Sequence, residues 1–157
     1  AYYKPLLFES VILGVSGKLG YVTGLGDKVT QSQRFNLGGR DIRGFGSGGI
    51  GPRDTGSSDA VGGNKMYAGS FEVVSNLGLD KDTGVRWTVF TDLGSLWGTD
   101  YPSGVTEPNA AHMRVSAGVG VFWSTAVGPL SFSWGTPLSK MAHDTSKTFQ
   151  FKIGARL

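Results

Sequence analysis

Cysteine is absent from all 157 residues of the chain. Its absence excludes a disulfide scaffold and a thiolate metal site. No stretch approaches the run of about 18 apolar residues that a transmembrane helix needs. The first residues, Ala1 to Lys4, also lack the basic segment and apolar core of a signal peptide, so we expect any export signal to lie upstream of them.

Sites for nucleic acid, metals or cofactors are also missing from the sequence. The 15 Lys and Arg residues are scattered singly, without runs or interleaved aromatic residues, which does not suit a nucleic-acid partner. The two histidines, His112 and His143, fall in predicted loops without metal-ligand spacing. Nothing around them resembles a nucleophile elbow. We therefore expect no metal, no cofactor and no enzymatic activity.

A period of two runs through most of the chain, with apolar residues on one face of each segment and small or polar residues on the other. In residues 113–125, for example, Val115 and Val119 oppose Ser116 and Gly118. This alternation is typical of β-strands. The six predicted strands are 8–21, 64–77, 85–97, 113–125, 130–138 and 147–157, and residues 1–7 are interpreted as the end of a further strand that turns at Pro5.

The connections between these strands alternate between long and short. Strands of about 9–11 residues or more with one apolar face suit an antiparallel transmembrane β-barrel, whose short turns and long loops lie on opposite sides of the membrane. Aromatic residues near the strand ends suit the girdles at the two membrane interfaces. They are Tyr21, Trp87, Trp97, Trp123 and Trp134. A soluble β-sandwich also alternates, but its strands are shorter, so we predict an all-β transmembrane barrel.

The longest connection, residues 24–63, has the composition of a loop but is far longer than loops in compact domains. Its centre carries a fixed cation, Arg43, and a large aromatic residue, Phe45, with glycines on both sides. Such residues are poor material for a flexible linker. We interpret the segment as an ordered functional loop.

Several segments together resemble the family of outer-membrane assembly and secretion barrels to which the assembly factor BamA belongs. The central one, Phe35 to Phe45, contains Gly38-Gly39 and Ile42-Arg43-Gly44-Phe45, and is similar to the sixth-loop motif of that family. The others are 51–52, 59–64, 92–97, 116–118, 128–130 and 149–154. They occur in the family's order over nearly the whole chain.

The resemblance implies that residues 1–157 are the C-terminal portion, about six strands, of a 16-stranded barrel in the bacterial outer membrane. It also implies a function in the assembly and insertion of β-barrel proteins into that membrane. The implied partners are outer-membrane lipids, nascent outer-membrane proteins, accessory assembly lipoproteins, and the N-terminal strands and periplasmic POTRA domains that this sequence does not include. Two alternatives stay open, a secretion transporter of the same family and a plain structural barrel.

In the family, the loop folds back inside the barrel and its Arg-Gly-Phe tip, here Arg43, Gly44 and Phe45, docks on the inner wall. The alternation in this sequence independently offers partners, because Glu72 and Asp92 are lone acids on the polar faces of adjacent predicted strands. A guanidinium suits two carboxylates. We expect Arg43 to contact both acids, Gly44 to permit a close backbone approach, and Phe45 to pack on the wall.

The last predicted strand, 147–157, is implied by the resemblance to form a weak seam with a first strand that is absent here. Its apolar face consists of Phe149, Phe151, Ile153 and Leu157, together with Ala155. The family's last strand usually ends in an aromatic residue where this chain has Leu157. Gly154 is predicted to lie within the strand, where it would weaken pairing or allow a kink.

Six strands are too few to close a barrel around a loop of this length, because even eight-stranded barrels are filled by their own side chains. Alone, such a sheet leaves two open edges that invite pairing. We therefore expect the chain to be a fragment that needs the missing strands or closes its edges by self-association.

Overall fold

The computed structural model describes residues 2–5, 11–76, 83–101, 103–106, 111–126 and 128–154. Its main element is one antiparallel sheet of seven strands. These are β1 (Tyr2–Pro5), β2 (Val11–Tyr21), β5 (Lys65–Ser75), β6 (Val85–Trp97), β8 (Arg114–Thr125), β9 (Gly128–Ser139) and β11 (Phe149–Ile153). No helix among the described residues is long and apolar enough to cross a membrane.

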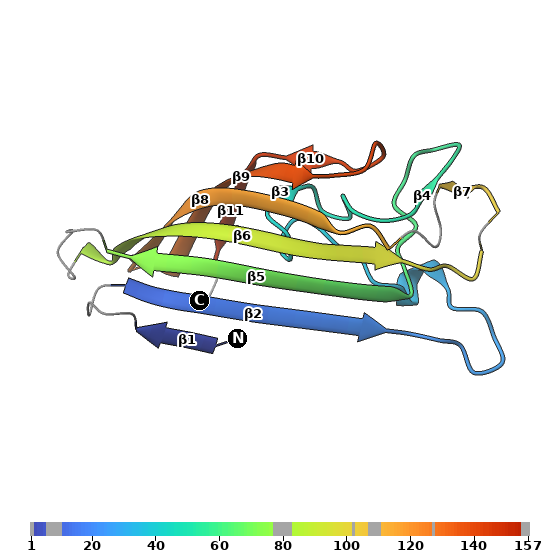
Figure 1. Cartoon of the computed structure of the whole chain (residues 1–157), viewed down its shortest axis with the longest axis horizontal. Coiled ribbons are helices and arrows are strands. Elements are labelled where there is room, and N and C mark those ends of the chain that lie inside the picture. Colours follow the sequence, from blue (N-terminus) through green and yellow to red (C-terminus); the bar gives the residue numbers. More distant parts are fainter. Residues whose placement is uncertain are drawn as a thin grey trace.

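The strand order is β1-β2-β5-β6-β8-β9-β11, so strands that follow one another along the chain are neighbours in the sheet (Figure 1). All six predicted strands are present, and β1 lies where the sequence indicated the end of a further strand. Pro5 is the last residue of β1 and pairs with Ile12. The turns predicted after Pro5 and around residues 78–82 lie outside the described residues.

The predicted alternation sorts the side chains onto the two faces of the sheet. Large apolar side chains lie exposed on the outer face, which is the face turned away from the long loop 24–63. They are Val15, Leu19, Tyr21, Phe71, Trp87, Val89, Leu93, Val119, Trp123, Trp134, Phe149, Phe151 and Ile153. The opposite face carries serines, glycines and acids, among them the buried Asp92 and Ser116. An apolar outer face with a polar inner face is the arrangement expected of a membrane barrel wall.

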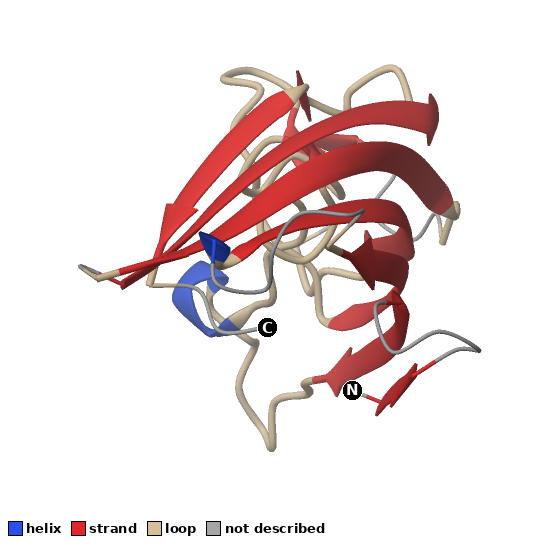
Figure 2. Cartoon of the chain, turned by 90° about the vertical axis from the view of Figure 1, so that its left-hand side faces the viewer, coloured by secondary structure: helices blue, strands red, loops and turns tan. Residues whose placement is uncertain are grey.

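The long loop 24–63 fills the hollow of the curved sheet (Figure 2). It contains a short 3-10 helix, η1 (Gln31–Gln33), and the two-residue strands β3 (Gly44–Phe45) and β4 (Arg53–Asp54). Both short strands pair outside the loop, β3 with β10 (Ser146–Lys147) and β4 with β7 (Val105–Thr106).

The apolar core of the described residues lies between this loop and the inner wall. It consists of Leu37, Ile42, Phe45 and Ile50 from the loop and Met66, Ala68 and Leu96 from β5 and β6. Burial of these side chains gives the loop an attachment that no flexible linker would have, because each fully buried Leu, Ile or Phe contributes about 1.5–3 kcal/mol. In the structure the loop is thus a packed segment on the inner wall, and its function stays a prediction.

The last strand is shorter than the sequence indicated. β11 ends at Ile153, and Gly154 follows it with a φ of +72° instead of lying within it as predicted. A residue in this left-handed region leaves the extended conformation of the strand, although the Gly154 amide still donates to the carbonyl of Pro129, the residue opposite it in the register of β9 and β11. Lys147 pairs with the long loop in β10. Residues 155–157, and with them Leu157, lie outside the described residues.

Two aromatic pairs lie across the boundary between β9 and β11 on the outer face. Phe149 packs on Trp134 with 5.2 Å between ring centroids, and Phe151 packs on Phe132 with 5.0 Å. Cross-strand aromatic pairs contribute roughly 0.2–1 kcal/mol each beyond alanine.

Candidate functional site

The centre of the candidate site is the ion pair between Arg43 at the tip of the long loop and Asp92 on the inner face of β6. Arg43 donates from Nε and Nη2 to the two carboxylate oxygens of Asp92, both at 2.8 Å. The Arg43 backbone amide donates to the same carboxylate at 2.9 Å. Because Asp92 is only 1% exposed, these three bonds replace its hydration almost completely.

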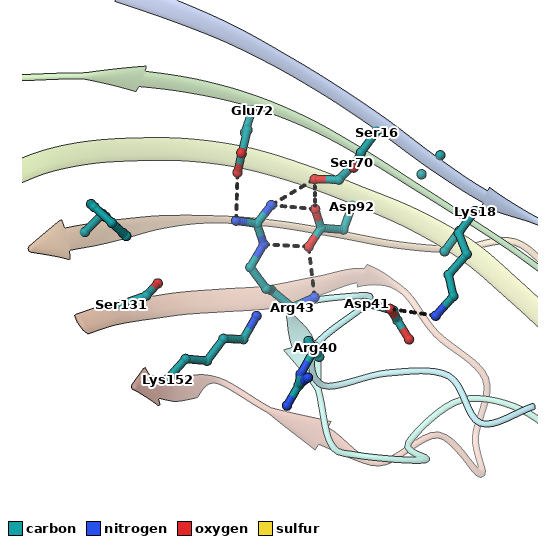
Figure 3. A pocket seen from close by; sticks show the side chains of 14 residues that line it. Ser16, Lys18, Arg40, Asp41, Arg43, Ser70, Glu72, Asp92, Ser131 and Lys152 are labelled. Atoms are coloured by element: carbon teal, nitrogen blue, oxygen red, sulfur yellow. Dashed lines mark hydrogen bonds and ion pairs between the residues drawn. The ribbon is translucent and has the colours of Figure 1, made fainter. Parts of the chain in front are cut away.

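Residues of β5 and β6 complete the surroundings of the guanidinium. Nη1 of Arg43 donates to Glu72 at 3.2 Å, and Nη2 donates to the Ser70 hydroxyl at 2.9 Å. Ser70 in turn donates to Asp92 at 2.6 Å. Below the guanidinium plane lies the ring of Phe90, with 3.6 Å from its centroid to Cζ of Arg43. Figure 3 shows Arg43 reaching from the loop to the three polar partners.

Two opposing effects act on the charge of Arg43. Burial alone would lower the pKa of its guanidinium, but the hydrogen bonds to Asp92 and the charges of Asp92 and Glu72 outweigh it and raise that pKa. The cation is therefore fixed at every physiological pH. The site is a permanent electrostatic clamp, hereafter the Arg43 clamp, comprising Arg43, Ser70, Glu72, Phe90 and Asp92.

Gly44 brings the loop backbone directly against the wall. It has a φ of +91°, and a Cβ built there would lie 3.2 Å from the Gly135 carbonyl carbon and 3.3 Å from Cβ of Ser116. Gly135 on β9 is equally crowded, because a Cβ there would lie 2.9 Å from the Gly44 amide nitrogen. Two glycines facing each other let loop and sheet approach at backbone distance.

Phe45 is fully buried at 0% exposure and belongs to the core between loop and wall. Its carbonyl accepts two hydrogen bonds, one from the Gly39 amide at 3.0 Å and one from Nε2 of Gln150 on β11 at 2.9 Å. The structure thus brings Arg43, Gly44 and Phe45 together with Glu72 and Asp92. What these contacts do for the protein stays a prediction.

The predicted residues of the last strand lie apart from the clamp. Phe149, Phe151 and Ile153 are exposed on the outer face, and Gly154 is exposed beyond the strand's end. Gln150, which alternates with them, reaches the loop with its side chain, and Lys147 pairs with the loop through its backbone.

Sequence reasoning missed Phe90 and a second buried ion pair. Phe90 occupies a position of the polar face of β6, and an isolated aromatic residue on such a face is a signal that could have found it. The ion pair joins Arg114 on β8 to Asp144, with Nε to Oδ2 at 2.9 Å and side-chain exposures of 4% and 0%. Two residues 30 positions apart in the chain offer no comparable signal.

A cavity of about 420 Å³ opens beside the clamp. Its walls include the four polar residues of the clamp, and also Lys18, Arg40, Asp41 and Lys152 (Figure 3). Lys18 donates to Asp41 at 3.2 Å. Among the described residues no group of three or more His, Asp or Glu side chains is placed to hold a metal ion, and His112 and His143 are exposed.

We expect the substitution Lys18→Ala to lower the free energy of unfolding by less than about 1 kcal/mol. The Lys18 side chain is 57% exposed, so solvent screens its pair with Asp41. Thermal unfolding in detergent, followed by circular dichroism, measures the change. A loss above about 2 kcal/mol would mean that Lys18 supports the loop as strongly as a buried partner does.

Comparisons with known proteins agree with this architecture. A family model described as the Omp85 superfamily domain matches residues 1–157. The chain is 32% identical over 92% of its length to the outer membrane protein assembly factor BamA of Neorickettsia risticii (strain Illinois). It is 29% identical over 94% of its length to the protein of the same name from Neisseria meningitidis serogroup B.

A solved structure is similar as well. The crystal structure of BamA from Haemophilus ducreyi lacking POTRA domains 1-3 matches 95% of the chain with a TM-score of 0.82 and 32% sequence identity. The chain spans 19% and 22% of the two curated relatives and 32% of the crystallised chain. The chain therefore belongs to the Omp85 superfamily and is a segment of an outer-membrane β-barrel.

Proposed function

We propose that this chain is part of the barrel of an insertase that assembles β-barrel proteins and inserts them into the bacterial outer membrane. The observation that carries the proposal is the long loop, which the Arg43 clamp fixes inside the curved sheet within reach of the edge strand β11. The relatives support the proposal, because three proteins similar to this chain are named outer membrane protein assembly factors.

The proposed mechanism uses β11 as a template for an incoming strand. In the described part of the chain β11 pairs only with β9, over five residues, so its other edge carries free backbone donors and acceptors. An extended client strand would add to that edge by β-augmentation. The role is non-enzymatic, because strand pairing replaces any chemical step.

The partners in this proposal follow from the two faces of the sheet and from the relatives. Membrane lipids would cover the outer apolar face, and nascent outer-membrane proteins would pair at β11. The remaining barrel strands, POTRA domains and accessory lipoproteins would belong to the complete machine. We place residues 1–157 in the C-terminal part of a 16-stranded barrel, with loop 24–63 turned inward.

The experiment reconstitutes the full natural protein in lipid vesicles and adds urea-denatured outer-membrane barrel proteins as clients. We expect folding of several unrelated clients to be accelerated, measured by the shift in their electrophoretic mobility without heating. Vesicles that contain an unrelated barrel are the control. Conductance or release of one specific passenger without such acceleration would indicate a secretion transporter. The absence of both effects would indicate a structural barrel.

A further inference from the structure

The segment just before and at the start of the last strand is bound both to the sheet, where the Gly135 amide donates to the Thr148 carbonyl at 2.8 Å, and to the long loop. We name residues 144–150 the latch. The Gly46 amide donates to the Thr145 carbonyl at 2.8 Å, and the Thr145 amide donates to the Gly49 carbonyl at 2.9 Å. β10, inside the latch, forms a two-residue ladder with β3.

Both ends of the latch are fixed by buried side chains. At its start, the Asp144 carboxylate accepts two hydrogen bonds from Arg114 and one from the Met141 amide. At its end, Gln150 is 8% exposed and donates to the Phe45 carbonyl. The loop, itself held by Arg43, therefore contacts the latch up to the start of β11, together with Arg114 of β8 and Gly135 of β9.

This attachment bears on register, the alignment of a strand with its neighbour. A slip of one residue would turn the apolar side chains of β11 inward, which burial of one face forbids. A slip of two residues keeps every side chain on its face, because Phe149, Phe151 and Ile153 are interchangeable apolar residues of the outer face. The alternation alone cannot reject such a slip. Gln150 can, because only one alignment places its amide at the Phe45 carbonyl.

We propose that the latch, through Gln150, fixes the register in which β11 pairs, so that the strand presents one alignment to whatever strand adds to its edge. Gln150 is thus a positioning residue, acting through the backbone of β11. The consequence for incoming strands rests on the assembly function proposed above. The register of β11 against β9 does not rest on it.

The first test therefore measures register inside the protein. In the full natural protein, the pair Phe132→Cys and Phe151→Cys reports the observed alignment, because these residues lie directly opposite each other. The pair Phe132→Cys and Phe149→Cys reports a slip of two residues. Since residues 1–157 contain no cysteine, these pairs add the only thiols within them.

We expect Gln150→Leu to raise the yield of the slipped disulfide about tenfold. A change of that size corresponds to the free energy of one lost hydrogen bond to a buried carbonyl. Lys152→Leu is the matched control, because Lys152 also faces inward from β11 but donates no hydrogen bond to the loop among the described residues. An unchanged yield with Gln150→Leu, or an equal rise with Lys152→Leu, would overturn the proposal.

The second test locks the latch. A Cβ on Gly46 would lie 3.9 Å from Cβ of Thr145, which suits a disulfide. We expect the oxidised Gly46→Cys, Thr145→Cys protein to assemble clients within about twofold of its reduced form, the scatter of ordinary surface substitutions. A larger loss that a reductant restores would show that the latch must open, and would overturn the proposal.

The two proposals fail in different ways. If the protein does not assemble clients, both the oxidised and the reduced protein are inactive, while the internal disulfide yields still report whether Gln150 fixes the register. If only the latch proposal fails, clients are assembled and Gln150→Leu leaves the slipped yield unchanged.

Discussion

Replacing Arg43 with glutamate is expected to abolish outer-membrane protein assembly by the full natural protein. The change removes the cation that neutralises Asp92 and sets three carboxylates together in a space where Asp92 is only 1% exposed. Removing one partner of a buried ion pair costs about 3–5 kcal/mol even without the added repulsion. A cost of about 3 kcal/mol reduces the population of the docked loop by more than about a hundredfold.

The test depletes the wild-type protein in cells that express the variant. The loss of function is then measured as the fall in the amount of folded outer-membrane proteins. Arg40→Glu is the control, because Arg40 is an exposed cation of the same loop with no ion pair among the described residues. The second change Asp92→Arg, which exchanges the two charges, is expected to restore part of the function. Loss without restoration would separate the function from this contact. Normal assembly by Arg43→Glu would remove the clamp from the mechanism.

The substitution Gly135→Val is expected to expel the loop tip from the wall. A Cβ on Gly135 would lie 2.9 Å from the amide nitrogen of Gly44 and 3.2 Å from its Cα, and both are backbone atoms that no rotamer change can move aside. Overpacking usually costs about 1–3 kcal/mol, and we expect a value at or above the upper end because the neighbours are backbone. Gly44 and Phe45 would lose their contacts together.

Limited proteolysis of the purified protein in detergent measures this effect, because a displaced loop exposes the buried Arg34 and the partly buried Arg43 to trypsin. Gly17→Val on β2 is the matched control. A Cβ at Gly17 meets nothing within 4 Å, and valine is favoured in strands. Cleavage of the loop should therefore rise only with Gly135→Val. A loop equally resistant in both variants would mean that the sheet moves away without releasing the tip.

Much of the fold was predictable because the side chains of a strand alternate between the two faces of its sheet. A two-residue period of apolar and polar residues therefore shows which residues share a face. Val89 and Leu93 are apolar and lie exposed on the outer face, while Asp92 between them is buried on the inner face. The start and end of β11 were not predictable, because Lys147 and Thr148 continue the strand pattern, and the sequence does not show that Gly154 takes a positive φ where the strand ends.

The partners of Arg43 were predictable from the same alternation. Glu72 and Asp92 are lone acids on adjacent strands, and the register places Ser70 opposite Asp92 and Phe90 opposite Glu72. Phe90 escaped prediction because an aromatic residue on a polar face contradicts the pattern, although a guanidinium stacked on a ring explains its place.

The contacts of the latch could not be predicted from the sequence. Gln150 and Phe45 are 105 residues apart, and the acceptor is a backbone carbonyl, which every residue possesses. Nothing in the residue types marks such a contact. Only the folded path of the loop shows that position 45 lies beneath position 150.

The packing of Trp134 on Phe149 gives the protein an optical reporter of its own last strand. The chain has four tryptophans, and Trp134 lies on β9 with its ring against a residue of β11. Indole emission responds to the immediate surroundings of the ring. With Trp87, Trp97 and Trp123 replaced by phenylalanine, Trp134 would be the one tryptophan left in residues 1–157, and their indole fluorescence would come from it alone. Departure of β11 would then change the emitted light in real time, without an attached dye.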